Sequence, residues 1–174
     1  MELYCDFICS VIQCFKTNGK VINVAILIDE INLLEIFKDL GKICKSPNVC
    51  GTCADKSCLI GYARSGAAEC RIAKRTGIMN GFENIPPCDI RGGYDEYEVL
   101  HAIAHLLVQC KGCKEDHYDN CLINIVRSCL EVIEFGEEQK YEGNAIQYLM
   151  KISQSNPTKA AIIQEEYMLH KDSE

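Results

Sequence analysis

The residues of this chain best suited to chemistry are its cysteines and histidines. The sequence of 174 residues contains 13 cysteines and 4 histidines. An odd cysteine count fits a complete disulfide framework badly. Thiolates and imidazoles are, however, the ligands that zinc prefers in proteins. The sequence therefore predicts a metal-binding protein, and the spacing of these residues indicates where a metal would be held.

The sharpest pattern is Cys110-x2-Cys113-x3-His117-x3-Cys121. The first two cysteines flank a glycine-containing turn, and the other two residues are four apart, which places them on one face of an expected helix. Three thiolates and one imidazole make a tetrahedral structural zinc site. The pattern resembles retroviral-type zinc knuckles over 12 residues, although its last two spacings are each one residue shorter. The alternative is that the cysteines are buried core residues, as free cysteines often are. Cys129 could replace one ligand or pack below the site.

A second cluster lies in the first half of the chain, at Cys44-x5-Cys50-x2-Cys53-x4-Cys58, with Cys88 further on. An irregular loop rich in cysteines can wrap a metal, so we expect a second metal site here. The spacing resembles that of adrenodoxin-type ferredoxins, and this resemblance implies a [2Fe–2S] cluster in an electron carrier or redox sensor. A thioredoxin-type redox pair at Cys50-x2-Cys53 is less well matched, because that motif opens a helix directly after a strand.

A third pattern, Glu98-x2-His101-x3-His105, places a carboxylate and two imidazoles on one helix face. Such a set can bind a divalent metal, and it defines a further alternative, a metal-dependent enzyme. It is not the metalloprotease motif H-E-x-x-H, because Ala102 stands where that motif needs its glutamate. The structural alternative is two histidines on a helix surface. A third possibility is that one of them replaces Cys110 as a zinc ligand or forms a hydrogen bond to a ligand of that site.

The second half of the chain predicts helices with clear punctuation. Asp95 is placed to accept from amides of a first helical turn, and Pro157 suits a first helical position after Asn156. Four helices are expected in this half. The first begins near Asp95 and ends at Gly112, and the second runs from Asp116 to the residues before Gly136. The third covers 144–152, and the fourth extends from Pro157 through Tyr167.

The first half is less regular. The sequence predicts a helix over 2–16, a turn at 18–19, a strand within 21–28, a helix over 29–40 closed by Gly41, a loop over 44–55, and a helix over 55–76 ended by Gly77. We therefore expect a mainly α, compact helical domain with a cysteine-rich loop in its first half and at most one or two short strands.

Charge divides the chain near the Gly92-Gly93 pair. Residues 1–91 contain 11 lysines and arginines against 10 acidic residues, whereas residues 92–174 contain 7 against 15. We expect a cysteine-rich region over 1–91 and an acidic helical region over 92–174, joined in one compact unit. An acidic half is poorly suited to a phosphate backbone, which argues against nucleic acid and favours a protein partner.

The expected cellular setting follows from the opening residues of the sequence. The opening residues contain acids and no base before Phe7, and there is no signal-peptide pattern or run of about 20 apolar residues. We therefore expect a cytoplasmic protein without a membrane span, whose thiols remain reduced. The leading hypothesis is a metal-binding protein with structural zinc, the alternatives being the iron–sulfur protein and the metal-dependent enzyme.

Overall fold

The computed structural model describes residues 27–28, 31–45, 47–51, 53, 55–110 and 119–171, and these residues are mainly helical, as expected. Two short strands, β1 (Leu27–Ile28) and β2 (Ile31–Asn32), pair antiparallel with Ile28 opposite Ile31. The helices are α2 (Leu33–Ile43), α3 (Pro47–Cys50), α4 (Leu59–Ala73), α5 (Glu96–Cys110), α6 (Leu122–Phe135), α7 (Ala145–Ser155) and α8 (Pro157–Lys171), with a 3-10 turn, η1, at Asp55–Ser57.

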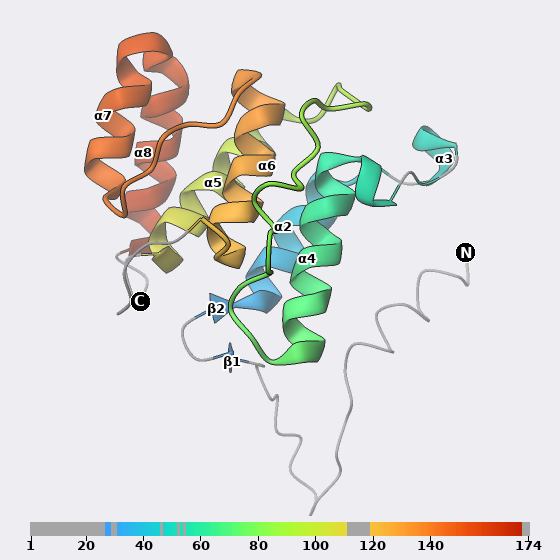
Figure 1. The fold of residues 1–174 in the computed structure, drawn as a ribbon. Helices are drawn as coiled ribbons and strands as arrows, with labels where there is room; N and C mark the ends of the chain where they lie inside the picture. Colours follow the sequence, from blue (N-terminus) through green and yellow to red (C-terminus); the bar gives the residue numbers. More distant parts are fainter. Residues whose placement is uncertain are drawn as a thin grey trace, which may run out of the picture.

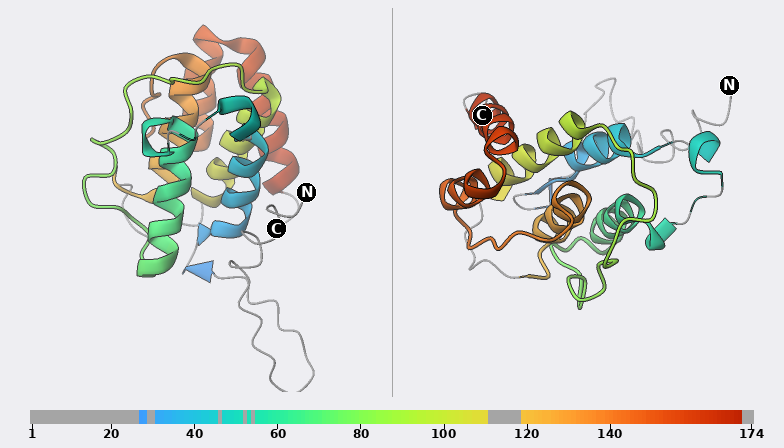
Figure 2. Two further views of the ribbon diagram at one scale, coloured as in Figure 1. Left: turned by 90° about the vertical axis from the view of Figure 1, so that its right-hand side faces the viewer. Right: turned by 90° about the horizontal axis from the view of Figure 1, so that it is seen from above.

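Helix α5 lies at the centre of the packing. It contacts α8 on one side, and α6 and α2 on the other, while α4 packs on α6 and α2. Figure 1 shows α7 and α8 as a pair at one end of the molecule and α2 and α4 at the other. The view from above in Figure 2 places α5 and α6 between these two pairs. A residue on α5 can therefore meet side chains of both α2 and α8.

The hydrophobic core draws on both halves of the chain. Leu40 of α2 and Leu59 of α4 are buried together with residues of α5, α6 and α8. The fully buried large side chains include Leu100, Ile103, Leu107, Leu122, Ile125, Leu130, Ile152 and Ile163. Burying a side chain of this size contributes about 1.5–3 kcal/mol, so the packing of α5 against its neighbours is a main source of stability.

Several helix boundaries follow the predicted signals. The Asp95 carboxylate accepts from the Glu98 amide at 3.2 Å, which confirms it as the start of α5. Gly136 ends α6 with a φ of 78°, a left-handed conformation that glycine adopts without steric cost. The Asn144 side chain accepts from the Gln147 amide, and α8 begins at Pro157.

Other boundaries differ from the prediction. Helix α2 begins at Leu33, because the Asn32 side chain accepts from the Glu35 amide and Ile31–Asn32 pair as a strand. It also continues through Gly41 to Ile43. Helix α4 ends at Ala73, since Lys74 takes the left-handed conformation expected at Gly77.

Two further expectations needed correction. The predicted loop over 44–55 contains the short helix α3. Helix α6 begins at Leu122 instead of Asp116, because residues 119–120 form a turn. Cys121 precedes the helix with extended backbone and bridges to Gly77.

A buried polar cluster lies where α6 faces α7. The Arg127 guanidinium donates to the Glu131 carboxylate, and both side chains are almost fully buried. The Tyr148 hydroxyl and the Gln139 amide also donate to Glu131, at 2.6 and 2.8 Å. These donors compensate the carboxylate for the water it loses, which a buried charge requires.

Among the described helices, none is both long and apolar enough to cross a membrane. The helix predicted over 2–16, the turn at 18–19, and the predicted ligands Cys113 and His117 lie outside the described residues.

Candidate metal centre

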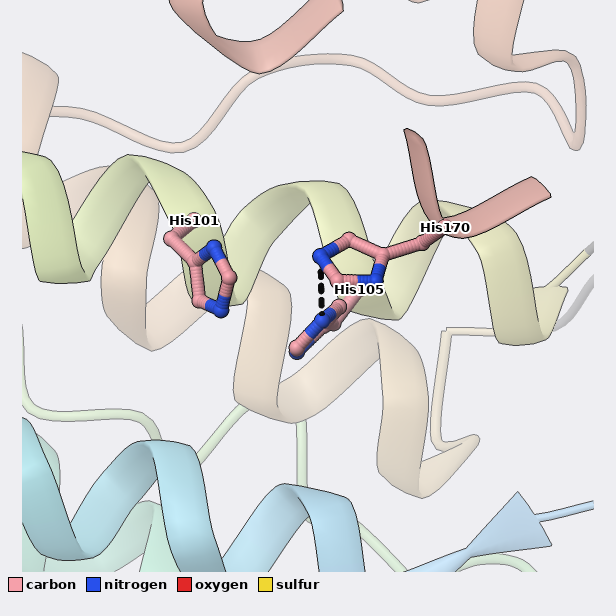
Figure 3. Close-up of side chains that lie close together, drawn as sticks. All are labelled: His101, His105 and His170. Atoms are coloured by element: carbon pink, nitrogen blue, oxygen red, sulfur yellow. Dashed lines mark hydrogen bonds between the residues drawn. The ribbon is translucent and has the colours of Figure 1, made fainter. Parts of the chain in front are cut away.

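Three of the four histidines meet where α5 faces the end of α8. His101 and His105 are four residues apart on α5, so their side chains leave the same face of the helix. His170 lies in the last turn of α8, which packs along that face. Figure 3 shows the three rings close together, with His170 approaching from α8.

The rings are in direct contact. The centroid of His105 lies 3.8 Å from that of His170 and 4.3 Å from that of His101. One nitrogen from each ring can be chosen so that all three lie within 4.8 Å of one another. Such a convergence of imidazole nitrogens is what a divalent transition metal needs.

Carboxylates hold two of the three rings in place. Asp39 of α2 contacts Nδ1 of His105 at 2.6 Å, and Glu166 of α8 contacts Nδ1 of His101 at 2.8 Å. Histidines that ligate metals usually donate their other ring N–H to a carboxylate, which fixes the tautomer and the ring orientation. Both contacts therefore direct the lone pair of each ring to Nε2, the nitrogen a metal would use.

Glu166 is itself well supported as an anion. The Tyr97 hydroxyl donates to its Oε1 at 2.5 Å. This hydrogen bond, followed by the contact with His101, lowers the pKa of Glu166 below its ordinary value, against the opposing effect of burial. A charged Glu166 strengthens the hydrogen bond from His101 and adds negative potential beside the three rings.

His170 contacts both Glu166, at 3.5 Å, and His105. The Nε2 atoms of the two histidines lie 2.7 Å apart, so one nitrogen donates and the other accepts (Figure 3). If the His105 Nδ1–H donates to Asp39, then His170 is the donor in this pair. Burial, followed by the neighbouring His105 and His101, lowers the pKa of His170, which favours a neutral imidazole near neutral pH. A neutral imidazole is the form that binds metal.

The cluster is half-buried and opens towards solvent at α8. The side chains of His101 and His105 are each 14% exposed, and that of His170 is 32% exposed. A small cavity borders Asp39 and His105 on the inner side and is otherwise lined mainly by apolar side chains. An ion at the three nitrogens would be shielded by protein on one side and reachable by water on the other.

A second group of potential ligands shares one of these histidines. It consists of one carboxylate oxygen each of Glu35 and Asp39 and one ring nitrogen of His105, which also lie within 4.8 Å of one another. Glu35 is occupied by an ion pair with Lys38 at 2.7 Å. We therefore regard Asp39 and Glu35 as the acidic surroundings of the three-histidine cluster.

The predicted cysteine–histidine site is only partly within the described residues. Cys110 is the last residue of α5 and Cys121 precedes α6, and both are half-buried against the core. Burial, and then the hydrogen bond to Cys110, raise the pKa of Tyr141. Cys121 has extended backbone directly before α6, and the other two predicted ligands, Cys113 and His117, lie outside the described residues. The zinc site itself stays a prediction.

Among the predicted ligands of the loop cluster, Cys44 directly follows α2, Cys50 ends α3 and Cys58 directly precedes α4. Cys44, Cys50 and Cys58 are half-buried, whereas Cys53 and Cys88 are exposed. The two groups of potential ligands that the described residues bring within 4.8 Å contain none of these cysteines. An iron–sulfur cluster at this position is likewise still a prediction.

The third pattern is brought together with one change of member. His101 and His105 do lie side by side, but Glu98 pairs with Lys42 at 3.4 Å and lies outside the three-histidine group. The third member of the group is His170, a residue that the sequence placed only in the tail. The sequence offered one signal for it, because Glu166 and His170 are four residues apart and so share one face of a helix. That signal points to this site only when α8 is known to pack on α5.

Comparison of the chain with family models, with curated proteins and with solved structures found no match. The function of the cluster has therefore to be argued from its own geometry.

Proposed function

We propose that the protein binds a divalent transition metal ion, zinc in the first instance, through His101, His105 and His170. The observation that supports this most strongly is the pairing of converging imidazoles with carboxylates on their far nitrogens. Either feature alone occurs in proteins without metal. Together they provide the ligands, their tautomers and their orientation.

The charges at the site also suit a dication. Asp39 and Glu166 contact the outer nitrogens of two of the rings. Three neutral imidazoles carry no charge, so two carboxylates balance an ion of charge +2. Glu166 also accepts a hydrogen bond from the Tyr97 hydroxyl, which supports its negative charge.

The spacing of the ligands needs only a small adjustment. Zinc–nitrogen distances of about 2.0–2.1 Å place the nitrogens of a tetrahedral site roughly 3.3 Å apart. The Nε2 atoms of His105 and His170 are 2.7 Å apart, and the whole set lies within 4.8 Å. Metal binding would replace the hydrogen bond between these two rings, with the His170 proton moving to its Nδ1.

Three protein ligands leave one coordination position for water. His170 is the most exposed of the three rings, so this water would bind on the side of the cluster where His170 is open to solvent. The proposed role of the ion is structural, because it would link α5 to α8. The coordination position occupied by water would also allow a further ligand to bind. This proposal is separate from the predicted cysteine–histidine site, and the full chain can hold both.

The proposal is tested by titrating the reduced, metal-free full chain with zinc in a calorimeter and with cobalt in a spectrophotometer. We expect His170→Ala to remove one zinc equivalent, or to weaken its binding at least about a hundredfold, more than the loss of a supporting carboxylate costs. Lys171→Ala is the matched control, because it changes the exposed neighbour of His170 on α8 and removes no ligand of this site or of the predicted cysteine–histidine site. Circular dichroism establishes that both variants are folded.

Cobalt distinguishes the kinds of ligand. A three-histidine site gives visible bands without the intense near-ultraviolet absorption of cobalt bound to thiolates. We expect His170→Ala to remove the former only. The proposal fails if the folded variant His170→Ala retains every zinc equivalent of the wild type, or if all the bound cobalt shows thiolate absorption.

A further inference from the structure

A pair of thiols lies at the opposite end of α2 from the paired strands, away from the histidine cluster. Cys44 directly follows α2, and Cys50 is the last residue of α3. The Sγ atoms of both lie within hydrogen-bond distance of one acceptor, the backbone oxygen of Lys45, at 3.5 and 3.8 Å. Both residues are half-buried, so the two sulfurs share a small, accessible region.

A guanidinium group is directed at one of these sulfurs. Nη1 of Arg64, on α4, lies 3.2 Å from Sγ of Cys44. A further guanidinium, that of Arg91, donates to the backbone oxygen of Cys50 at 3.1 Å. Nearby arginine stabilises a thiolate, and the thiolate is the nucleophilic form of cysteine. Cys44 thus has the surroundings of a reactive thiol, with a second thiol nearby.

Four other cysteines among the described residues differ from this pair in their surroundings. Cys70 is fully buried, and burial raises its pKa to about 11. Cys129 is also fully buried, and burial raises its pKa as well. Cys53 and Cys88 are exposed at the surface. Cys44 and Cys50 differ from these four in sharing one backbone acceptor and in the contact of Cys44 with Arg64.

We propose that Cys44 and Cys50 form a redox-active pair that is converted to a disulfide by hydrogen peroxide. The Cys44 thiolate attacks one peroxide oxygen, the O–O bond breaks, and Cys44 becomes a sulfenic acid as hydroxide leaves. The Cys50 thiol then attacks the Cys44 sulfur and releases water. In sum two thiols lose two electrons and two protons, and one peroxide is reduced to two molecules of water.

The disulfide would change the local structure. It replaces the contact between Arg64 and the Cys44 sulfur with a covalent link from the end of α2 to α3. A small-molecule thiol such as glutathione reverses the link by thiol–disulfide exchange, itself becoming oxidised. The inference does not depend on the histidine cluster.

The test treats the reduced full chain with a slight excess of hydrogen peroxide, stops the reaction at intervals with N-ethylmaleimide, and identifies linked peptides by mass spectrometry. Trypsin separates Cys44 from Cys50 by cleaving after Lys45, and leaves Cys50 and Cys53 in one peptide. We expect the linked peptides in the wild type and in Cys53→Ser, and their absence in Cys50→Ser. Cys53→Ser is thus the matched control.

The role of the guanidinium is measured by the rate of oxidation. We expect Arg64→Gln to slow the loss of the Cys44 thiol about tenfold, the scale of one hydrogen bond to a charged group. Arg71→Gln, on the same helix beside Phe37, should leave the rate unchanged. A link between Cys50 and Cys53 instead, no link at all, or an unchanged rate in the folded variant Arg64→Gln would each overturn the proposal.

Discussion

At the scale of single residues, the carboxylates behind the histidines are the main support for the proposed metal site. Glu166 contacts His101 and receives a hydrogen bond from Tyr97, so its position is fixed from two sides. Asp39, on α2, contacts Nδ1 of His105 at 2.6 Å. Removing either group leaves the three ligands present but less well oriented and less basic.

We therefore predict that Glu166→Gln weakens zinc binding by about tenfold to a hundredfold without abolishing it. Competition with a chromophoric chelator measures the change. Glu165→Gln is the control, because this exposed neighbour on α8 carries the same charge. Equal effects of the two substitutions would show that only the overall charge matters, and would contradict the assigned role of Glu166.

The reactivity of the cysteines is a second test at this scale. We expect Cys53 and Cys88 to react rapidly with N-ethylmaleimide in the native protein at neutral pH, because they are exposed. Cys70 and Cys129 should react only on unfolding, because both are buried and burial raises the pKa of each thiol, that of Cys70 to about 11. Peptide mapping after timed labelling gives the order, and rapid native labelling of Cys70 would contradict it.

At the scale of elements, the cluster joins helices that are distant in sequence. His101 and His105 belong to α5, His170 to α8 and Asp39 to α2. A metal bound only to the folded arrangement stabilises it by about 2.7 kcal/mol when its concentration is a hundred times the dissociation constant. The effect should be largest where the ligands would otherwise separate first, at the C-terminal end of α8.

Hydrogen exchange can locate this effect. We predict that zinc slows amide exchange in the last turns of α8 more than in the core of α4, which contributes no ligand to the cluster. Mass spectrometry of the exchanging protein with and without zinc provides the comparison. Equal protection of the two helices by a metal that is known to bind would place the ion elsewhere.

The buried pair between Arg127 and Glu131 is a separate contribution of α6. We predict that Arg127→Met destabilises the protein by about 3–5 kcal/mol, because it leaves the Glu131 carboxylate buried without its cation. Chemical denaturation measures the loss. Lys140→Met, which breaks the fully exposed pair with Glu142, should change stability little. If Arg127→Met lowered the free energy of unfolding as little as Lys140→Met does, Glu131 would not be charged in the folded protein.

At the scale of the whole molecule, the elements were easier to predict than the site. Local signals such as the Asp95 cap and the Gly136 stop act within one turn, and the structure confirms both. Where a tertiary contact decided the boundary, the prediction was wrong. Helix α6 begins only at Leu122. The segment before it, 120–122, is paired with 76–78 because the Leu122 amide donates to the Thr76 oxygen and the Ile78 amide donates to the Asn120 oxygen.

The candidate metal centre shows the same division. The pairing of His101 with His105 followed from helical spacing on one element. The third ligand did not, because His170 is 65 residues from His105 and reaches it only through the packing of α8 on α5. Glu98 satisfied the spacing equally well, yet its carboxylate turns to Lys42 of α2.

The central claim is that a metal ion binds between His101, His105 and His170. Anomalous diffraction from crystals of the zinc-loaded full chain, recorded on either side of the zinc absorption edge, tests it most directly. We expect a peak within about 2.0–2.1 Å of one nitrogen of each ring. Zinc peaks that lie only among the cysteines, or no peak between the three rings of a zinc-saturated crystal, would contradict the account.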